Sequence, residues 1–251
     1  MKGILLAGGT GTRLLPLTHI TNKHLIAVYD RPMIDYPLNF LIKNGISDIL
    51  VVSGREHAGH FVNYLGSGKD RNINLTYKVQ EKAGGIADAL GLAEDFAHGE
   101  NVAVILGDNF FEDVLDKDIK NFDALVKESG PASNIFLKSV AHPEHFGVAM
   151  MSASDNRILH LEEKPVNAKT NLAITGFYLF DNSVFSKIKK LEPSKRGELE
   201  ITDVLKFYLE DNRLFSSVLA GFWGDMGQFT TLAEVIGWLK NNRDAGDNRM
   251  I

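Results

Sequence analysis

The chain has 251 residues, of which 44% are hydrophobic and 24% are charged, and it carries a formal net charge of −5 and no cysteine. This balance is ordinary for a globular protein, and the missing cysteine excludes disulfides, thiolate catalysis and cysteine-ligated zinc. The charge includes no basic block, so nothing indicates a nucleic-acid partner. No apolar run approaches the roughly 20 residues of a membrane span or the roughly 7–15 of a signal peptide. We therefore expect a cytoplasmic protein without a membrane segment.

The first half of the chain alternates strand and helix patterns. Short apolar runs at 4–7, 49–53, 75–79 and 102–106 are typical of strands covered on both faces of a parallel sheet. Between the first two, a helix with Met33, Tyr36, Phe40 and Leu41 on one face is predicted to begin at Pro32 and to end at Gly45. A second helix is predicted over 85–96. This alternation predicts βαβ units.

The second half is less regular. Strands are predicted at 135–140 and 173–180, a hairpin over 148–161 with its turn at Asp155-Asn156, and a helix over 184–191. A last amphipathic helix, which carries Leu239, is predicted to begin at the capping-box pattern Thr231-x-x-Glu234, and the residues from 241 onward are expected to fray. No repeat or linker interrupts the chain. These patterns predict one continuous domain with a mixed sheet.

A glycine-rich loop over residues 8–12 follows the first strand, and two cations, Arg13 and Lys23, come after it. The dinucleotide fingerprint fails because Leu14 stands where its third glycine belongs, and a P-loop fails because the only Gly-Lys pair is followed by Asp70. Taken alone, the cluster also fits a plain strand-exit turn. A phosphate site here would depend on loop amides and side-chain cations, since Pro16 disfavours a helix directly after the loop.

The order Gly-Gly-x-Gly-Thr-Arg-Leu, Pro16, Thr18, Lys23 and Pro-Met-Ile at 32–34 resembles the signature of the sugar-1-phosphate nucleotidyltransferases. Over nearly the whole chain, the closer resemblance is to the short form of their glucose-1-phosphate thymidylyltransferase branch. It is carried by residues 77–80, 84–87, 106–109, 146–148, 161–165, 175–178, 196–203 and 223–227.

The resemblance implies a Rossmann-like three-layer α/β/α nucleotidyltransferase fold with a mixed central sheet. It implies a single domain over 1–251, with a nucleotide-binding part over about 1–110, a sugar-phosphate part over about 111–227, and a C-terminal helix and tail over about 228–251. The implied reaction transfers dTMP from dTTP to glucose 1-phosphate, with Mg²⁺, and gives dTDP-glucose and pyrophosphate by in-line attack at the α-phosphorus. The implied assembly is a homo-oligomer, a dimer or a tetramer.

The resemblance also assigns residues. Asp108 and Asp225 would bind the metal, Arg13 the leaving pyrophosphate, Lys23 the phosphates near the α position, and Lys164 the sugar phosphate. These five would form the catalytic group. The nucleotide would contact Leu6, Gly8, Gly9, Thr10, Gly11, Thr12, Arg13, Gln80, Gly85 and Asp108, and the sugar would contact Asn109, Gly147, Glu163, Lys164, Ile174 and Tyr178.

Residue chemistry is compatible with these roles. Both reacting groups are anionic, so catalysis needs charge neutralisation and positioning, and Mg²⁺ prefers carboxylate and phosphate oxygens. Gln80 has both a donor and an acceptor for a pyrimidine edge, and Gly85 puts no side chain in the way of the base. Glu163 can accept two sugar hydroxyls.

The chain departs from the family pattern at two positions. Ala27 stands where the family usually has proline, which we expect to loosen the presentation of Lys23. Gly224 replaces a bulkier residue, which we expect to slacken the loop of Asp225. The chain ends soon after Leu239, so the regulatory site of longer members is expected to be absent or incomplete.

Other readings stay open. The histidine pairs at 57/60 and 142/145 are interpreted as polar loop or helix-end residues, because neither has a third ligand in pattern. A uridylyltransferase that prefers UTP and a non-catalytic sugar-nucleotide-binding regulatory homologue are the alternative functions. The chain keeps Arg13, Lys23, Asp108 and Asp225, which favours an enzyme.

Overall fold

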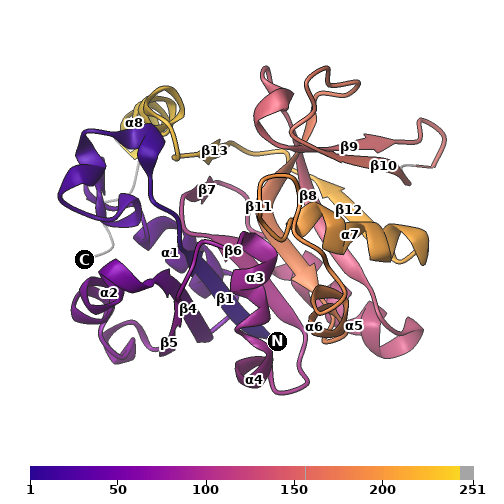
Figure 1. The fold of residues 1–251 in the computed structure, drawn as a ribbon, viewed down its shortest axis with the longest axis horizontal. Helices are drawn as coiled ribbons and strands as arrows, with labels where there is room; N and C mark the ends of the chain where they lie inside the picture. The colour runs from indigo at the N-terminus through magenta and orange to yellow at the C-terminus, as the bar shows by residue number, and fades with distance from the viewer. Residues whose placement is uncertain (156, 244–251) are drawn as a thin grey trace.

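The computed structural model describes residues 1–155 and 157–243. Within them, nine strands form one mixed sheet that separates two layers of helices (Figure 1). Four of the strands are parallel and lie in the spatial order β5, β4, β1 and β6, and β11 runs antiparallel beside β6. The bounds of these strands are β1 (Lys2–Ala7), β4 (Asp48–Gly54), β5 (Asn74–Gln80), β6 (Val102–Leu106) and β11 (Leu172–Phe180).

The second half of the chain extends the sheet beyond β11. One side of β11 pairs with β8 (Ser133–Ser139), and β12 (Leu214–Val218) lies parallel to β8. The hairpin of β9 (Gly147–Met151) and β10 (Ile158–Glu163) joins the other side of β11. Two short ladders stand apart from the sheet: β2 (Ala27–Val28) with β3 (Arg31–Pro32), and β7 (Asn109–Phe111) with β13 (Trp223–Asp225).

Helices cover both faces of the sheet, which explains why its central strands β1, β4, β6 and β11 are mostly apolar. Along β1, Ile4 and Leu6 pack into the core on one face, and Leu5 and Ala7 into the core on the other. The first core includes residues of α3 (Ile86–Gly91), α4 (Glu94–Ala97), α6 (Val184–Ile188) and α7 (Ile201–Glu210). The second includes residues of α1 (Asp35–Lys43), α2 (Ala58–Leu65) and α5 (Asp116–Ser129).

Sequence signals at the helix ends agree with the helix dipole. Asp35 lies in the first turn of α1 and Lys43 in its last turn. Asp116 and Asp118 lie in the first turn of α5. Gly130 then ends α5 with a φ of 83°, a conformation that glycine adopts without strain.

The last helix, α8 (Phe229–Arg243), belongs to a third apolar cluster. Its Leu232, Val235 and Leu239 pack with residues of the segment that follows the glycine loop and with Met226, next to Asp225. Figure 1 shows α8 beside that N-terminal segment. Leu239 is 2% exposed, so it is a core residue of the chain.

Several predicted helix boundaries are wrong. Pro32 lies in β3 and pairs with Ala27, so α1 begins three residues later, at Asp35. The helix predicted over 85–96 is divided into α3 and α4. Thr231 lies inside α8 and its hydroxyl donates to the carbonyl of Gln228, so the predicted capping box does not start the helix.

The predicted α/β/α architecture with a mixed sheet is confirmed. The turn residue Asn156 and the tail over 244–251, where fraying was expected, lie outside the described residues, although α8 runs on to Arg243. The division at about 110 and 227 stays a prediction. None of the helices in the described ranges has the length and apolar character to cross a bilayer.

Candidate active site

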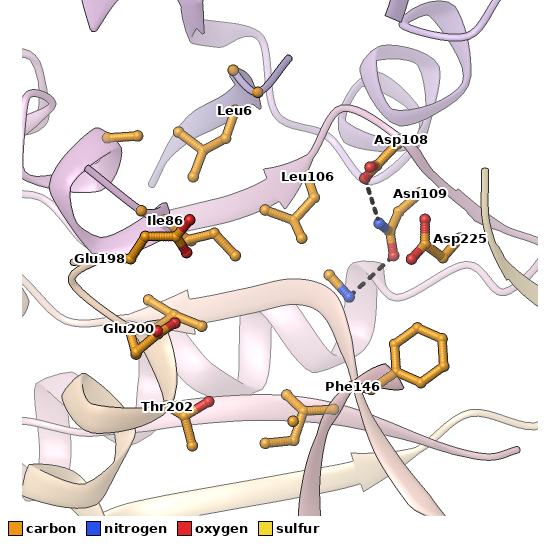
Figure 2. Close-up of a pocket in the computed structure, with 18 of the residues that line it drawn as sticks. Leu6, Ile86, Leu106, Asp108, Asn109, Phe146, Glu198, Glu200, Thr202 and Asp225 are labelled. Atoms are coloured by element: carbon orange, nitrogen blue, oxygen red, sulfur yellow. Dashed lines mark hydrogen bonds between the residues drawn. The ribbon is translucent and has the colours of Figure 1, made fainter. Parts of the chain in front are cut away.

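A cavity of about 350 Å³ lies at the carboxyl ends of the parallel strands. Leu6 near the end of β1, Gln80 at the end of β5 and Leu106 at the end of β6 contribute to its lining. In open α/β sheets this edge is where ligands bind. Figure 2 shows Leu6 and Leu106 between an acidic group, Asp108 and Asp225, and a second polar group that includes Glu200.

Most of the residues predicted for the site lie around this one cavity. Those that line it are Leu6, Gly8, Gly9, Arg13, Lys23, Gln80, Gly85, Asp108, Asn109, Gly147, Glu163, Lys164, Ile174, Tyr178 and Asp225. Three others, Thr10, Gly11 and Thr12, are described by the structure but do not line the cavity.

The glycine loop folds over the stem of Lys23. Gly11 has a φ of 65°, and a Cβ built on it would lie 3.0 Å from the Cβ of Lys23 and 2.8 Å from Cγ2 of Thr18. The Thr18 hydroxyl donates to the Gly11 carbonyl at 2.9 Å. The chain then makes one 3₁₀ turn over Thr12–Leu14 and becomes extended at Leu15. No α-helix follows the loop directly, as expected from the position of Pro16.

Lys23 is anchored without the family's proline. The side chain of Asn22 caps its 3₁₀ turn by accepting from the backbone N–H of His24 at 2.9 Å. Two further backbone bonds tie the segment to the start of α1: Met33 N–H to Ile26 and Ile34 N–H to His24. Ala27 itself pairs with Pro32 in the β2–β3 ladder.

The two predicted metal ligands lie at the same end of the β7–β13 ladder, Asp108 directly before β7 and Asp225 at the end of β13. Asp108 follows β6, Asp225 ends β13, and Asp225 is in register with Asn109 across the β7–β13 ladder. A Cβ on Gly227 would lie 2.8 Å from Oδ1 of Asp225 and 3.3 Å from Oδ2 of Asp108. It would also lie 3.1 Å from Nη2 of Arg13. Two carboxylates and a guanidinium therefore converge on one point.

Neighbouring charges and burial shift the pKa values of the two carboxylates in opposite directions. Lys23 Nζ donates to Asp108 Oδ2 at 2.5 Å. Burial alone would raise the pKa of Asp108, but the charge of Lys23, the neighbouring His24 and the hydrogen bonds from Lys23 and Asn109 together outweigh burial and hold that pKa well below the ordinary value. Burial and then the negative charge of Asp108 raise the pKa of Asp225. The negative charge of Asp108 thus disfavours ionisation of Asp225, and a cation bound to both carboxylates would relieve this repulsion.

Asn109 orients Asp108. Its amide Nδ2 donates to Oδ1 of Asp108 at 3.0 Å, and its Oδ1 accepts from the Gly176 N–H at 3.1 Å and from the Trp223 indole N–H at 2.7 Å. Figure 2 shows the bond to Asp108. The resemblance implied a sugar contact for Asn109, and this residue does line the cavity, but most of its hydrogen-bonding capacity serves the protein.

Gly85 is needed for a contact different from the one expected. It has a φ of 97°, and a Cβ on it would lie 2.5 Å from the carbonyl oxygen of Leu199. The Leu199 N–H donates to the Gly84 carbonyl, and the Leu199 carbonyl accepts from the Ala87 N–H. Gly85 therefore lets the segment before α7 approach the wall of the cavity.

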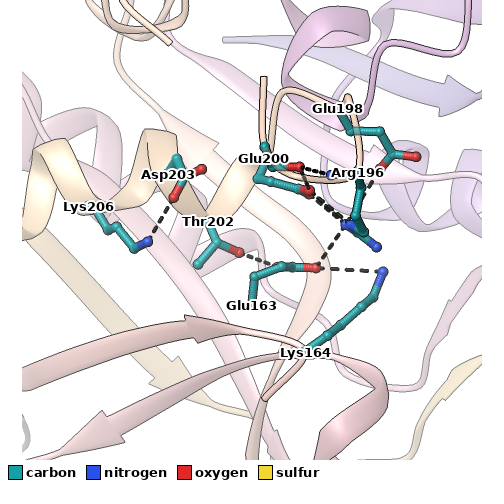
Figure 3. Close-up of polar contacts among 9 residues, drawn as sticks. Glu163, Lys164, Arg196, Glu198, Glu200, Thr202, Asp203 and Lys206 are labelled. Carbon is teal, nitrogen blue, oxygen red and sulfur yellow. Dashed lines mark hydrogen bonds and ion pairs between the residues drawn. The ribbon is translucent and has the colours of Figure 1, made fainter. Parts of the chain in front are cut away.

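Glu163 is the centre of a polar group on the far side of the cavity (Figure 3). The Thr202 hydroxyl donates to its Oε2, and Lys164 Nζ and Arg196 Nη2 each lie 3.6 Å from its Oε1. A Cβ on Gly147 would lie 3.1 Å from Oε2 of Glu163, so glycine leaves room beside the carboxylate. The carboxylate is thus held in place by three partners.

Two predicted sugar-site residues come from β11. Ile174 and Tyr178 are 6% and 4% exposed and line the cavity. Burial, with the charges of Glu163 and Asp108, raises the pKa of Tyr178, so its hydroxyl stays protonated at neutral pH.

Several residues that line the cavity were not predicted from the sequence to have a role. Arg196 pairs with Glu200 at 2.8 Å and with Glu198 at 3.5 Å, and His24 lies buried behind Lys23. Arg196 and Trp223 lie within stretches that carry the resemblance, which was the available signal. No sequence pattern points to His24.

The histidine pairs form no metal site. The rings of His57 and His60 are 5.5 Å apart and those of His142 and His145 are 5.9 Å apart. In the part of the chain that the structure describes, no three His, Cys, Asp or Glu side chains gather as ligands. Any ion between Asp108 and Asp225 would need further ligands from substrate or water.

Comparisons with known proteins identify the family to which the chain belongs. The model of the nucleotidyl transferase family matches residues 2–241. A glucose-1-phosphate thymidylyltransferase of Neisseria meningitidis is 40% identical over 245 residues, 96% of this chain and 83% of that protein. The enzyme of the same name from Mycobacterium tuberculosis is 40% identical over 243 residues, 96% of this chain and 82% of that protein.

Solved structures show the same fold. A Bacillus anthracis protein provisionally named a glucose-1-phosphate thymidylyltransferase, in complex with a sucrose, has a TM-score of 0.90 and 44% identity and covers 99% of this chain and 98% of its own. A UDP-glucose pyrophosphorylase complexed with UDP-glucose has a TM-score of 0.81, covers 96% of this chain and 99% of its own, and at 24% identity is alike in fold alone. The resemblance found in the sequence is confirmed, and the chain belongs to the nucleotidyl transferase family.

Proposed function

We propose that this protein is a glucose-1-phosphate thymidylyltransferase that transfers dTMP from dTTP to glucose 1-phosphate and releases pyrophosphate. The observation that supports this proposal most strongly is the pair of carboxylates, Asp108 and Asp225, beside Arg13 and Lys23 at the strand ends. The group around Glu163 and Lys164 lies across the same cavity. The relatives that bear this enzyme name are 40% identical over 96% of the chain.

Nucleotidyltransferases of this family generally use a divalent metal. We propose Mg²⁺, held by Asp108 and Asp225, because a hard ion that takes one or two carboxylates and completes its shell with phosphates and water fits this donor set. When bound, the ion would neutralise charge that develops on the phosphates.

The remaining residues divide between the two substrates. Arg13, Lys23 and the glycine loop (Gly8, Gly9, Thr10, Gly11 and Thr12) would face the triphosphate, with Leu6, Gln80 and Gly85 around the base. Lys164 would bind the phosphate of the sugar, and Glu163 would accept its hydroxyls. Asn109, Gly147, Ile174 and Tyr178 would complete the sugar site. These roles, which the resemblance implies, agree with the position of most of the residues on one cavity.

The residues act mainly by neutralising charge and fixing geometry. A phosphate oxygen of glucose 1-phosphate forms a bond to the α-phosphorus, and the bond from that phosphorus to the oxygen bridging to the β-phosphate breaks in line. Arg13 would stabilise the negative charge on the departing pyrophosphate with its permanently charged planar group. Lys23 would move from Asp108 toward the α-phosphate oxygens when the substrate binds.

Pyrophosphate release with dTTP, glucose 1-phosphate and Mg²⁺ tests the proposal. Asp108→Asn and Asp225→Asn each remove a charge with little change in volume, and we expect both to abolish turnover. Asp95→Asn, on the exposed face of α4, is the matched control and should keep full activity. Nucleotide binding without turnover by the unmodified protein would favour a non-catalytic homologue, and unchanged turnover in both variants would overturn the metal assignment.

Three further expectations accompany the proposal. Residues 1–110 would form mainly the nucleotide part and residues 111–227 mainly the sugar-phosphate part. The protein would work in the cytoplasm in dTDP-sugar synthesis. It would assemble as a dimer or tetramer, which sedimentation would measure; since Leu239 is buried within the chain, it would not provide the interface.

A further inference from the structure

The amide of Gln80, the residue proposed to face the base, is fixed by Asp88. Gln80 ends β5 and is 8% exposed. Its Nε2 donates to Oδ2 of Asp88 at 2.6 Å and to the carbonyl oxygen of Gly85 at 3.3 Å. Both amide hydrogens of Gln80 are therefore used inside the protein. The sequence suggested that Gln80 would offer the base a donor and an acceptor, but only the acceptor is available.

The chemistry of the partners determines which way the amide points. A carboxylate and a backbone carbonyl can only accept hydrogen bonds, so the NH₂ end of Gln80 must face Asp88 and Gly85. The oxygen end then points the other way: a Cβ on Gly8 would lie 3.1 Å from Oε1 of Gln80. Oε1 thus lies next to the glycine loop, and Gly8 and Gln80 both line the cavity.

The local backbone makes room for this arrangement. Asp88 lies in α3, directly after the Gly84-Gly85 turn. A Cβ on Gly84 would lie 2.5 Å from Oδ2 of Asp88, the same oxygen that accepts from Gln80. Any side chain at position 84 would therefore displace the Asp88 carboxylate. Gly84 and Asp88 form one unit that holds the Gln80 amide.

We propose that Asp88 is a specificity-determining residue that, by fixing Gln80, makes the site select pyrimidines that carry a hydrogen on N3. This rests on the proposed function. Thymine and uracil present N3–H as a donor to Oε1 of Gln80. Cytosine presents an unprotonated N3, so two acceptors would face each other without a hydrogen. Asp88 is not among the residues that line the cavity, so it acts as a positioning residue through Gln80.

Asp88→Asn is the sharpest variant, because an asparagine keeps the shape of the side chain but can donate as well as accept. The Gln80 amide can then reverse, giving up only its longer 3.3 Å hydrogen bond to the Gly85 carbonyl, and offer NH₂ to N3 of cytosine. Gly84→Ala should have the same effect by displacing Asp88. The matched control is Asp95→Asn, which removes an equal charge from a side chain that is 92% exposed on the neighbouring helix α4.

The experiment measures dissociation constants for dTTP, UTP and dCTP with Mg²⁺ and without glucose 1-phosphate, so that binding is read without turnover. A buried polar group left unpaired weakens binding by roughly 5- to 150-fold, so the unmodified protein should prefer dTTP over dCTP within or above this range. In Asp88→Asn and Gly84→Ala the preference for dTTP over dCTP, measured as the ratio of their dissociation constants, should fall by about fivefold or more. The dTTP-to-UTP ratio should not change, because both bases carry N3–H.

The outcomes separate the two claims. If the unmodified protein prefers dTTP and the two variants keep the same dTTP-to-dCTP ratio, the role of Asp88 is overturned and the proposed function stands. A uniform loss of affinity for all three nucleotides would likewise mean that Asp88 only supports the fold. If the unmodified protein shows no preference for dTTP or UTP over dCTP, both claims are overturned.

Discussion

Trp223 donates its indole N–H to the side-chain oxygen of Asn109 at 2.7 Å and so connects the strand that carries Asp225 to the residue that orients Asp108. The indole also packs edge-on against Phe146, with ring centroids 5.3 Å apart. One hydrogen bond thus joins the structural supports of both proposed metal ligands: β13, which carries Asp225, and Asn109, which orients Asp108. Changing a group that orients a metal ligand typically lowers metal affinity by roughly 10- to 100-fold.

Trp223→Phe should therefore weaken metal binding while keeping the fold. The phenyl ring preserves the contact with Phe146, but Asn109 loses one of its fixed donors and Asp108 is held less firmly. We expect about a tenfold loss of Mn²⁺ affinity, measured by electron paramagnetic resonance, and a similar fall in kcat. Trp238→Phe, which changes an indole on α8 that stacks on Phe222, is the control. Equal Mn²⁺ affinity in both variants would contradict the positioning role.

His24 should make the fold sensitive to mild acid. Its ring is 1% exposed, and burial, followed by the charge of Lys23, lowers its pKa to about 3. In the unfolded chain the pKa is about 6.5, so below that pH the unfolded state takes up a proton that the folded state refuses. The stability that a neutral His24 contributes is present above pH 6.5 and is lost as the pH falls toward 3.

His24→Gln should remove this dependence. Between pH 7.5 and pH 5 the unmodified protein should lose about 2 kcal/mol more unfolding free energy than the variant, because 1.5 pH units below 6.5 are involved. Urea unfolding at the two pH values measures the difference. The same loss in both proteins would mean that His24 is protonated in the folded state.

Gly224 is required by the packing of α8. A Cβ at this position would lie 2.3 Å from Cγ2 of Val235, so the helix occupies the space that a side chain at 224 would need. The expectation that Gly224 slackens the loop of Asp225 stays a prediction. Gly224→Ala should lower the unfolding free energy by about 1–3 kcal/mol. In the double variant with Val235→Ala, thermal unfolding should show a smaller loss of stability than the sum of the two single losses, because the clash is relieved. If the two losses simply add, Gly224 and Val235 are not in the contact described.

Lys164 should affect binding of the sugar phosphate more than the chemical step. Its side chain is 45% exposed at the cavity, and Lys206, outside the cavity lining, has the same exposure (Figure 3). Lys164→Met should raise KM for glucose 1-phosphate about tenfold or more, because a charged hydrogen bond is lost. Lys206→Met should leave KM unchanged. Steady-state rates over a range of sugar phosphate decide, and equal KM values in both variants would remove Lys164 from the phosphate site.

The parallel part of the sheet could be predicted from the sequence because β1, β4 and β6 are buried on both faces and because β5, at the edge, still alternates apolar and polar residues. Residues 4–7, 49–53, 75–79 and 102–106 form β1, β4, β5 and β6 almost as expected. Helices were harder, since α5 and α7 carry many polar residues and their apolar faces depend on what they pack against. The start of α8 was missed because packing against Met226 and Leu14, which no local pattern records, places the helix.

The site residues that lie in sequence motifs could be predicted. The contacts that hold those residues in place could not. Asp108, Asp225, Lys23 and Gln80 were singled out from the sequence and line one cavity. Two contacts that support these residues, Asp88 with Gln80 and Trp223 with Asn109 beside Asp108, join positions 8 and 114 residues apart. Such pairs follow from the folded geometry, and a single sequence gives no sign of them.

The nucleotide preference of the enzyme decides whether it is a thymidylyltransferase. Steady-state pyrophosphate release would be measured with glucose 1-phosphate and Mg²⁺ against dTTP, UTP, dCTP, dATP and dGTP. We expect the highest kcat/KM with dTTP, lower turnover with UTP and little with dCTP or the purines. If UTP exceeded dTTP by a large factor, the thymidylyltransferase assignment would be wrong, and if no nucleotide released pyrophosphate, the protein would not be the proposed enzyme.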